Sequence, residues 1–141
     1  MTANELRIGN WVMCQFRGEY KPHAIKSIYF NDEEKLYFVE LDNGFKCNVN
    51  GISPIELTNE LLEKLGFQLT DKPIVKTDLR LSPYFVYRKS IENTHIDIDS
   101  VQLFILQIGT GNVANIRDVR HLHQIQNAYY MVTGQELNIE L

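Results

Sequence analysis

The sequence has few cysteines and no long apolar run, and each shortage excludes a class of protein. Its 141 residues include only Cys14 and Cys47, which form neither a disulfide framework nor a closely spaced zinc pattern. No apolar run approaches the roughly 20 residues that span a bilayer, and the N-terminus lacks the regions of a signal peptide. We therefore expect a cytoplasmic protein without membrane association, in which both cysteines are small buried hydrophobes.

Reaction motifs are missing as well. The chain has no Gly-x-Ser-x-Gly elbow for a nucleophilic serine, and neither cysteine has a local catalytic signature. Residues 109–112 contain two glycines but lack the third glycine and the lysine of phosphate-binding loops, which makes them a turn. The net charge is −4, so no overall field draws the molecule to nucleic acid. These absences weigh against an enzyme, and we expect no cofactor.

Length and composition are those of an ordinary globular protein. Hydrophobic residues make up 44% and charged residues 23% of the chain. A chain of this length can bury one core but is short for two ordinary domains. We find no Gly/Ser/Pro-rich linker and no repeat. The sequence therefore predicts one domain over residues 1–141, with a soft division into residues 1–67 and 68–141.

The first half of the chain is predicted to form a small sheet. Strand-like runs cover residues 11–16, 23–30, 35–41 and 45–49, and Asp42-Asn43-Gly44 is a strong hairpin signal between the last two. Several short strands separated by polar turns suggest a strongly bent sheet or a small SH3-like barrel. Thr58 then caps a short helix that ends at Gly66.

The second half returns to strands and finishes with a helix. Strand-like runs at residues 74–81, 83–88, 95–99 and 101–108 predict an antiparallel meander that ends at residues 109–112. The helix after it is predicted to begin at Asp118 as the N-cap and to stop at Gly134. The fold class is therefore α+β, with a bent N-terminal sheet, a short helix, a meander and a C-terminal amphipathic helix.

An apolar stripe on this last helix is expected to dock on the second sheet. Gln126 falls inside the stripe and must find partners for its amide, because an unpaired buried amide costs roughly 1–3 kcal/mol. At about 100° per residue, the stripe comprises Leu122, Ile125, Tyr129 and Val132.

Polar residues beside the stripe are the first candidate binding site. His123, Asn127 and Tyr130 are spaced by four and three residues, so they lie side by side along what we call the helix border. The helix border could recognise a protein, a base or a small polar ligand. The alternative is that its side chains bond to the backbone of neighbouring strands. His121 and His123 point roughly 200° apart on a helix and cannot share one metal ion.

A second candidate site is the strand that carries His95, Asp97 and Asp99. The three side chains project from one face of the strand, and imidazole with carboxylates can hold zinc, manganese or iron. Neighbouring side chains on one face are nearly 7 Å apart, so a single ion would need the strand to bend. An ordinary half-exposed strand shows the same pattern, and we regard a metal site here as a weak candidate.

The third candidate is a single-stranded nucleic-acid site on the N-terminal sheet, because small barrels often present aromatic and basic side chains to single strands. Acidic residues share the region and interrupt any basic stripe, among them Glu19, Glu40 and the run from Asp32 to Glu34. The residues that such a site would use are Trp11, Phe16, Arg17, Tyr20, Lys21, His23 and Lys26.

Three blocks of sequence carry a resemblance to a family. Residues 5–10 (ELRIGN) form the first block and residues 55–67 the second, while residues 123–137 form the third and begin HQIQN. Together they resemble a family of small uncharacterised proteins encoded in Bacteroidetes genomes and their mobile elements or prophages. Glu56 replaces the proline usual in that family, and Ile125 replaces leucine. The resemblance implies a lineage and brings no activity, substrate or catalytic residue.

The leading hypothesis is a non-enzymatic interaction protein that serves as an accessory protein of a mobile element. It would bind another protein through the helix border or through the aromatic face of the first sheet. The first alternative is single-stranded nucleic-acid binding by the N-terminal barrel, and the second is a metal-dependent enzyme. The sequence leaves the oligomeric state open.

Overall fold

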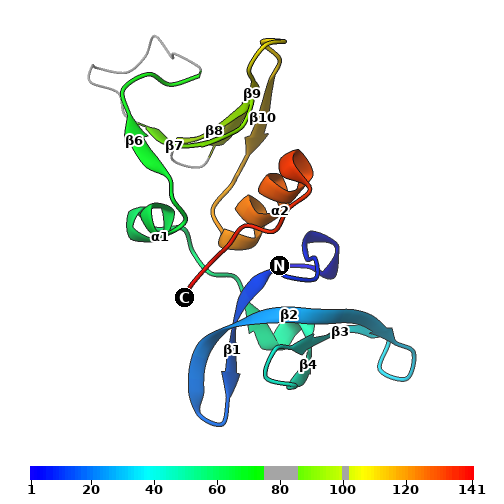
Figure 1. Cartoon of the computed structure of the whole chain (residues 1–141). Coiled ribbons are helices and arrows are strands. Elements are labelled where there is room, and N and C mark those ends of the chain that lie inside the picture. The colour runs from blue at the N-terminus through cyan, green and yellow to red at the C-terminus, as the bar shows by residue number, and fades with distance from the viewer. Residues whose placement is uncertain (75–85, 100–101) are drawn as a thin grey trace. The chain divides into compact units, whose positions relative to one another are not determined.

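The residues that the structure describes form mostly antiparallel sheet with two α-helices, and the chain divides into two compact units (Figure 1). The computed structural model describes residues 1–74, 86–99 and 102–141. Unit 1 comprises Met1–Leu57, His121–Leu137 and Leu141, and unit 2 comprises Thr58–Arg120 and Asn138–Glu140. The final helix therefore belongs with the first sheet, although its stripe was expected to dock on the second. Within the described ranges, no helix is long and apolar enough to span a membrane.

Unit 1 is built on a five-stranded sheet in the order β4-β3-β2-β1-β5. After η1 (Ala3–Glu5), the strands are β1 (Trp11–Phe16), β2 (Glu19–Asn31), β3 (Leu36–Leu41), β4 (Lys46–Asn48) and β5 (Ile52–Ser53). One turn, η2 (Val49–Gly51), joins β4 to β5 although these strands lie at opposite edges. The sheet must therefore curl until its edges approach, which agrees with the predicted bent sheet.

The core of unit 1 lies inside this curl. Val12 and Cys14 alternate with less buried neighbours along β1, as expected for a strand with one face turned to the core. The β3–β4 turn matches the predicted hairpin, because Gly44 has a φ of 80° and its N–H donates to the Leu41 carbonyl at 2.9 Å. The buried cluster consists of Val12, Cys14, Ile25, Val39, Leu41 and Ile52.

The helix α2 (Leu122–Thr133) completes unit 1. Its start was predicted wrongly: Asp118 has a φ of 58°, and His121 is the N-cap. The segment before the helix is held extended because His121 forms a β-bridge with Glu56 and the Leu122 N–H donates to the Ile55 carbonyl at 2.9 Å. The helix stops at Gly134, as predicted, with a φ of 69°.

Unit 2 holds a second antiparallel sheet in the order β10-β9-β8-β7-β6. It begins with α1 (Asn59–Lys64), where the Thr58 hydroxyl accepts from the Leu61 N–H at 3.1 Å as predicted. The strands are β6 (Gln68–Thr70), β7 (Val86–Ile91), β8 (Thr94–Asp99), β9 (Gln102–Gln107) and β10 (Val113–Arg117). Residues 75–81 of the strand expected at 74–81, and parts of those expected at 83–88 and 101–108, lie outside the described residues.

Two strands of unit 2 were missed. Residues 109–112 were expected to end the sheet, but they turn the chain from β9 into β10. β10 shows no alternation of buried and exposed residues, because four of its five residues are exposed. β6 is only three residues long and has no buried member. Neither strand has the periodic pattern on which a prediction depends.

Candidate interaction surface

The side chains of the helix border are mostly engaged in contacts within the protein, and His123 shows this most clearly. Its side chain is 1% exposed, and neither ring nitrogen has a hydrogen-bond partner among the described residues. His121 was predicted wrongly to point away from His123, because His121 is the extended N-cap and not part of the helix; its ring stacks on that of His123 with 5.7 Å between centroids. Burial, assisted by the charge of His121, lowers the pKa of His123 to about 4. His123 is therefore a neutral core residue at pH 7, and it was not predicted to be buried.

Asn127 and Gln126 tether α2 to the chain that leads into β1. Asn127 donates to the Glu5 carbonyl at 2.8 Å and accepts from the Asn10 amide at 2.9 Å. Gln126 accepts from the Trp11 N–H at 2.9 Å and donates to the Gly9 carbonyl at 3.0 Å. The expected partners of Gln126 are thus backbone groups, and the bonds of Asn127 follow the structural alternative for the helix border.

Tyr130 is the one member of the helix border that is exposed, at 41%. The Arg7 guanidinium lies 4.0 Å from the centre of its ring. Arg7 also binds both carboxylate oxygens of Glu136, at 2.5 and 2.9 Å. The hydrogen bonds between them raise the pKa of Arg7 and lower that of Glu136. The exposed Tyr130 ring is therefore already engaged by Arg7, and Arg7 is engaged by Glu136, so few polar groups here remain unpaired for binding a partner.

The basic and aromatic residues predicted for nucleic-acid binding do not gather into one site. Lys21 pairs with Glu19 at 2.6 Å, and His23 contacts Asp42 at 2.8 Å. Arg17 extends over the Phe16 ring at 5.1 Å.

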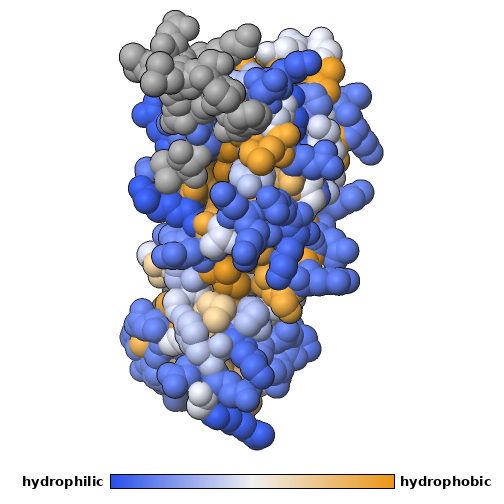
Figure 2. All heavy atoms as spheres, turned by 90° about the vertical axis from the view of Figure 1, so that its left-hand side faces the viewer, coloured by the Kyte–Doolittle hydropathy of each residue, from blue (hydrophilic) through white to orange (hydrophobic). Residues whose placement is uncertain are grey.

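Tyr20 is exposed, with its hydroxyl 2.5 Å from that of Ser53, whereas Trp11 is half-buried in β1. Figure 2 shows mainly hydrophilic side chains at the end of unit 1 that carries the β1–β2 turn. The basic side chains of this end are thus interspersed with acids and form no continuous stripe.

The side chains of the weak metal candidate on β8 are engaged in hydrogen bonds within the protein. Asp97 is 1% exposed, and its two oxygens accept from Arg88 at 2.6 and 2.8 Å and from the Ile74 N–H at 2.7 Å. The hydrogen bond to Asp97 raises the pKa of Arg88. His95 Nδ1 lies 2.8 Å from the Ser90 hydroxyl, and Asp99 is buried. Within the described ranges, no three His, Cys, Asp or Glu residues are grouped to hold a metal.

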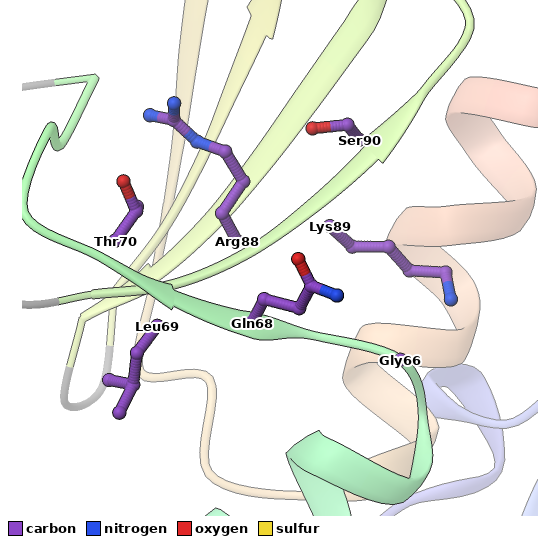
Figure 3. Close-up of a pocket in the computed structure, with 7 residues that line it drawn as sticks. All are labelled: Gly66, Gln68, Leu69, Thr70, Arg88, Lys89 and Ser90. Atoms are coloured by element: carbon purple, nitrogen blue, oxygen red, sulfur yellow. The ribbon is translucent and has the colours of Figure 1, made fainter.

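A pocket of about 420 Å³ lies in unit 2 beside the edge strand β6 (Figure 3). Its two cations are already engaged: Arg88 pairs with Asp97, and Lys89 donates to the Leu65 carbonyl at 2.5 Å. Figure 3 shows the Lys89 side chain running toward Gly66, away from the Arg88 guanidinium. Burial lowers the pKa of Lys89. The lining residues are Gly66, Gln68, Leu69, Thr70, Arg88, Lys89 and Ser90. Ser90 is the lining residue whose hydroxyl lies 2.8 Å from His95 Nδ1.

The far end of the β2–β3 hairpin carries an exposed apolar surface. Its members are Tyr29, Phe30, Leu36 and Tyr37, which are 36–46% exposed and which we call the hairpin patch. Phe30 and Tyr37 meet edge to face at 5.1 Å, and Tyr29 stacks on Phe38 at 5.9 Å. Because consecutive residues in a strand point to opposite faces, the aromatic pairs lie on both faces of the hairpin.

The turn at the tip of this hairpin is acidic and ordered. Asn31 accepts from the N–H groups of Glu33 and Glu34 at 2.9 and 3.2 Å. Asp32 is 3.6 Å from the Lys35 ammonium, which leaves the two glutamates as the excess charge. Sequence reasoning named the aromatic face of the first sheet but not this surface. The available signal was two pairs of consecutive aromatic residues, at 29–30 and 37–38, which leave no polar face on a strand.

Comparison with known proteins yields no match to a protein family, to a curated protein or to a solved structure.

Proposed function

We propose that this chain is a non-enzymatic interaction protein that binds a partner protein through the hairpin patch. The observation that carries the proposal is the exposure of four large apolar side chains at one end of a two-stranded hairpin. Single exposed apolar residues are common, but four at one end of a hairpin, three of them aromatic, are typical of contact surfaces. The rings also hold each other in fixed orientations, which lowers the entropy lost on binding.

The charge around the hairpin patch indicates the chemistry of the partner. Glu33 and Glu34 project from the tip beside the patch, and both are exposed. A protein surface with apolar pockets bordered by lysine or arginine would complement this arrangement, whereas a phosphate backbone would be repelled. The partner that fits is therefore a protein with a basic rim.

The proposal is tested by affinity purification from the source organism with the wild type and two variants. In one variant Phe30→Ser and Tyr37→Ser remove the aromatic pair, and in the matched control Met131→Ser removes an exposed apolar side chain from α2. We expect a protein that is recovered with the wild type and the control and lost with the patch variant. Far-UV circular dichroism checks that all three are folded. Recovery of the same proteins with all three would contradict the proposal.

Single-stranded nucleic-acid binding by unit 1 is the second candidate. Tyr20, exposed at 57%, and Arg17 beside the Phe16 ring favour it, because bases stack on aromatic rings and guanidinium groups. It would also suit an SH3-like interpretation of the curled sheet. Fluorescence anisotropy with a labelled single-stranded oligonucleotide separates the two candidates. Affinity that falls steeply as salt rises supports nucleic-acid binding, and no binding at low salt supports a protein partner.

The resemblance drawn from the sequence extends the proposal. An accessory role in a mobile element or prophage, carried out in the cytoplasm, would suit a small protein that acts by binding. Locating a tagged copy in cells of the source organism and identifying the genes beside its own would test this setting.

A further inference from the structure

The two cysteines lie on strands that are separated in the sheet and brought together by its curl. Cys14 is in β1 and Cys47 is in β4, and β2 and β3 stand between them in the sheet order. Cys14 is 1% exposed within the buried cluster of unit 1, and Cys47 is a half-buried residue packed against that cluster. Their common location is thus the core of the curled sheet.

The path of the chain explains how they meet. After Cys47, the single turn η2 leads into β5, and Ile52 of β5 pairs directly with Cys14 of β1. The turn packs closely on Cys47, because a side chain built at Gly51 would lie 3.4 Å from Cys47 Cβ and 3.6 Å from its Sγ. We propose that Cys14 and Cys47 form an intramolecular disulfide when the protein meets a hydroperoxide, which links β1 to β4 across the curl.

The reaction takes two steps. The Cys47 thiolate attacks one oxygen of hydrogen peroxide, the O–O bond breaks, and the departing hydroxide takes a proton to leave as water. Cys47 is then a sulfenic acid, oxidised by two electrons. The Cys14 sulfur next attacks the Cys47 sulfur and displaces hydroxide, which leaves as water with the proton of the Cys14 thiol. Overall, two thiols and one peroxide give one disulfide and two waters.

Cys47 is assigned the first step because it is the more accessible of the two thiols. Burial and the neighbouring Cys14 thiol raise the pKa of Cys47 to about 11. The thiolate is therefore scarce at pH 7, and the rate of oxidation rises about tenfold for each pH unit below that pKa. The disulfide is accordingly a slow response to sustained peroxide. This inference does not rest on the proposed protein partner.

The test is treatment of the folded full chain with hydrogen peroxide at pH 7 and pH 9, followed by intact mass measurement and peptide mapping. We expect a monomer whose mass is about 2 Da lower and a peptide pair joined through Cys14 and Cys47, formed faster at pH 9. The loop closed by the bond has about 34 residues, so the unfolding equilibrium constant should fall by roughly two to three orders of magnitude. A higher thermal midpoint would show this.

Cys14→Ala and Cys47→Ala are the matched variants, and each should abolish the mass loss. The peptide map of the wild type decides the question alone if either variant fails to fold. Oxidised protein that retains both thiols, disulfide-linked dimers, or Cys47 carried on to a sulfinic acid about 32 Da heavier would each overturn the inference.

Discussion

The neutral, buried His123 should make the stability of unit 1 fall at acidic pH, and replacing it should remove that fall. Burial lowers its pKa from 6.5 to about 4, so between these values the unfolded chain binds a proton that the folded chain does not. Stability contributed by the neutral ring is complete above pH 6.5 and is lost as the pH falls toward 4.

The magnitude follows from the shift. A difference of about 2.5 pKa units corresponds to about 3 kcal/mol at 1.36 kcal/mol per unit, and about 2 kcal/mol of it should be lost between pH 7.5 and pH 5. In His123→Leu an apolar side chain of similar volume replaces a ring whose nitrogens have no partner among the described residues. At pH 7.5 this variant should remain within about 1.5 kcal/mol of the wild type.

Urea denaturation followed by tryptophan fluorescence is the assay. Trp11 is the single tryptophan and lies in β1, where its backbone N–H donates to Gln126. The fluorescence signal therefore reports on unit 1. His95→Gln in unit 2 is the matched control and should keep the acid-linked loss. The reasoning is refuted if the free energies of unfolding of the wild type and His123→Leu stay parallel from pH 7.5 to pH 5.

Three further predictions concern stability. Gln126→Leu leaves buried backbone groups such as the Trp11 N–H unpaired, so urea denaturation should show a free energy of unfolding lower by about 2 kcal/mol or more. An unchanged urea midpoint would contradict the claim that Gln126 stabilises the attachment of α2 to β1. Arg88→Met leaves the Asp97 carboxylate buried without its cation and should cost about 3–5 kcal/mol, measured as a lower thermal midpoint that partly recovers in the double variant with Asp97→Leu. Gly134→Ala forces a side chain into a left-handed conformation and should cost about 1 kcal/mol by the same thermal assay, whereas no change would mean that the helix end rearranges freely.

Local signals in the sequence predicted the local features of the fold. The strand at Trp11–Phe16 has alternating burial, the turn at Gly44 needs a positive φ, and Thr58 caps α1 through its hydroxyl. Each of these features depends on residues within a few positions of one another. Gly134 is a further case, because a glycine after the last turn is itself the stop signal.

Features decided by distant residues could not be predicted in the same way. A helical wheel places His123 beside the apolar stripe, but its burial depends on what covers that side of the helix. The partners of Gln126 and Asn127 are Gly9, Asn10 and Glu5, more than 100 residues earlier in the chain. The helix start was misplaced for a similar reason, since a bridge to Glu56 keeps the preceding segment extended.

The candidate site shows the same division between local and distant effects. Aromatic residues at 29–30 and 37–38 could be seen in the sequence, yet their exposure depends on where the curl of the sheet ends. β1 pairs with β2 only as far as Ala24, and β4 pairs with β3 only as far as Phe38. The hairpin therefore continues beyond both neighbouring strands, and the hairpin patch lies on this extension.

The central claim is that the hairpin patch binds a protein, and the affinity of the recovered partner tests it most directly. Biolayer interferometry would compare the wild type, the Phe30→Ser and Tyr37→Ser double variant, and the Met131→Ser control, each checked for folding. Central aromatic contacts often contribute 2 kcal/mol or more, so the patch variant should bind roughly 30-fold more weakly or worse, with the control unchanged. Equal affinity of the patch variant and the wild type would contradict the claim.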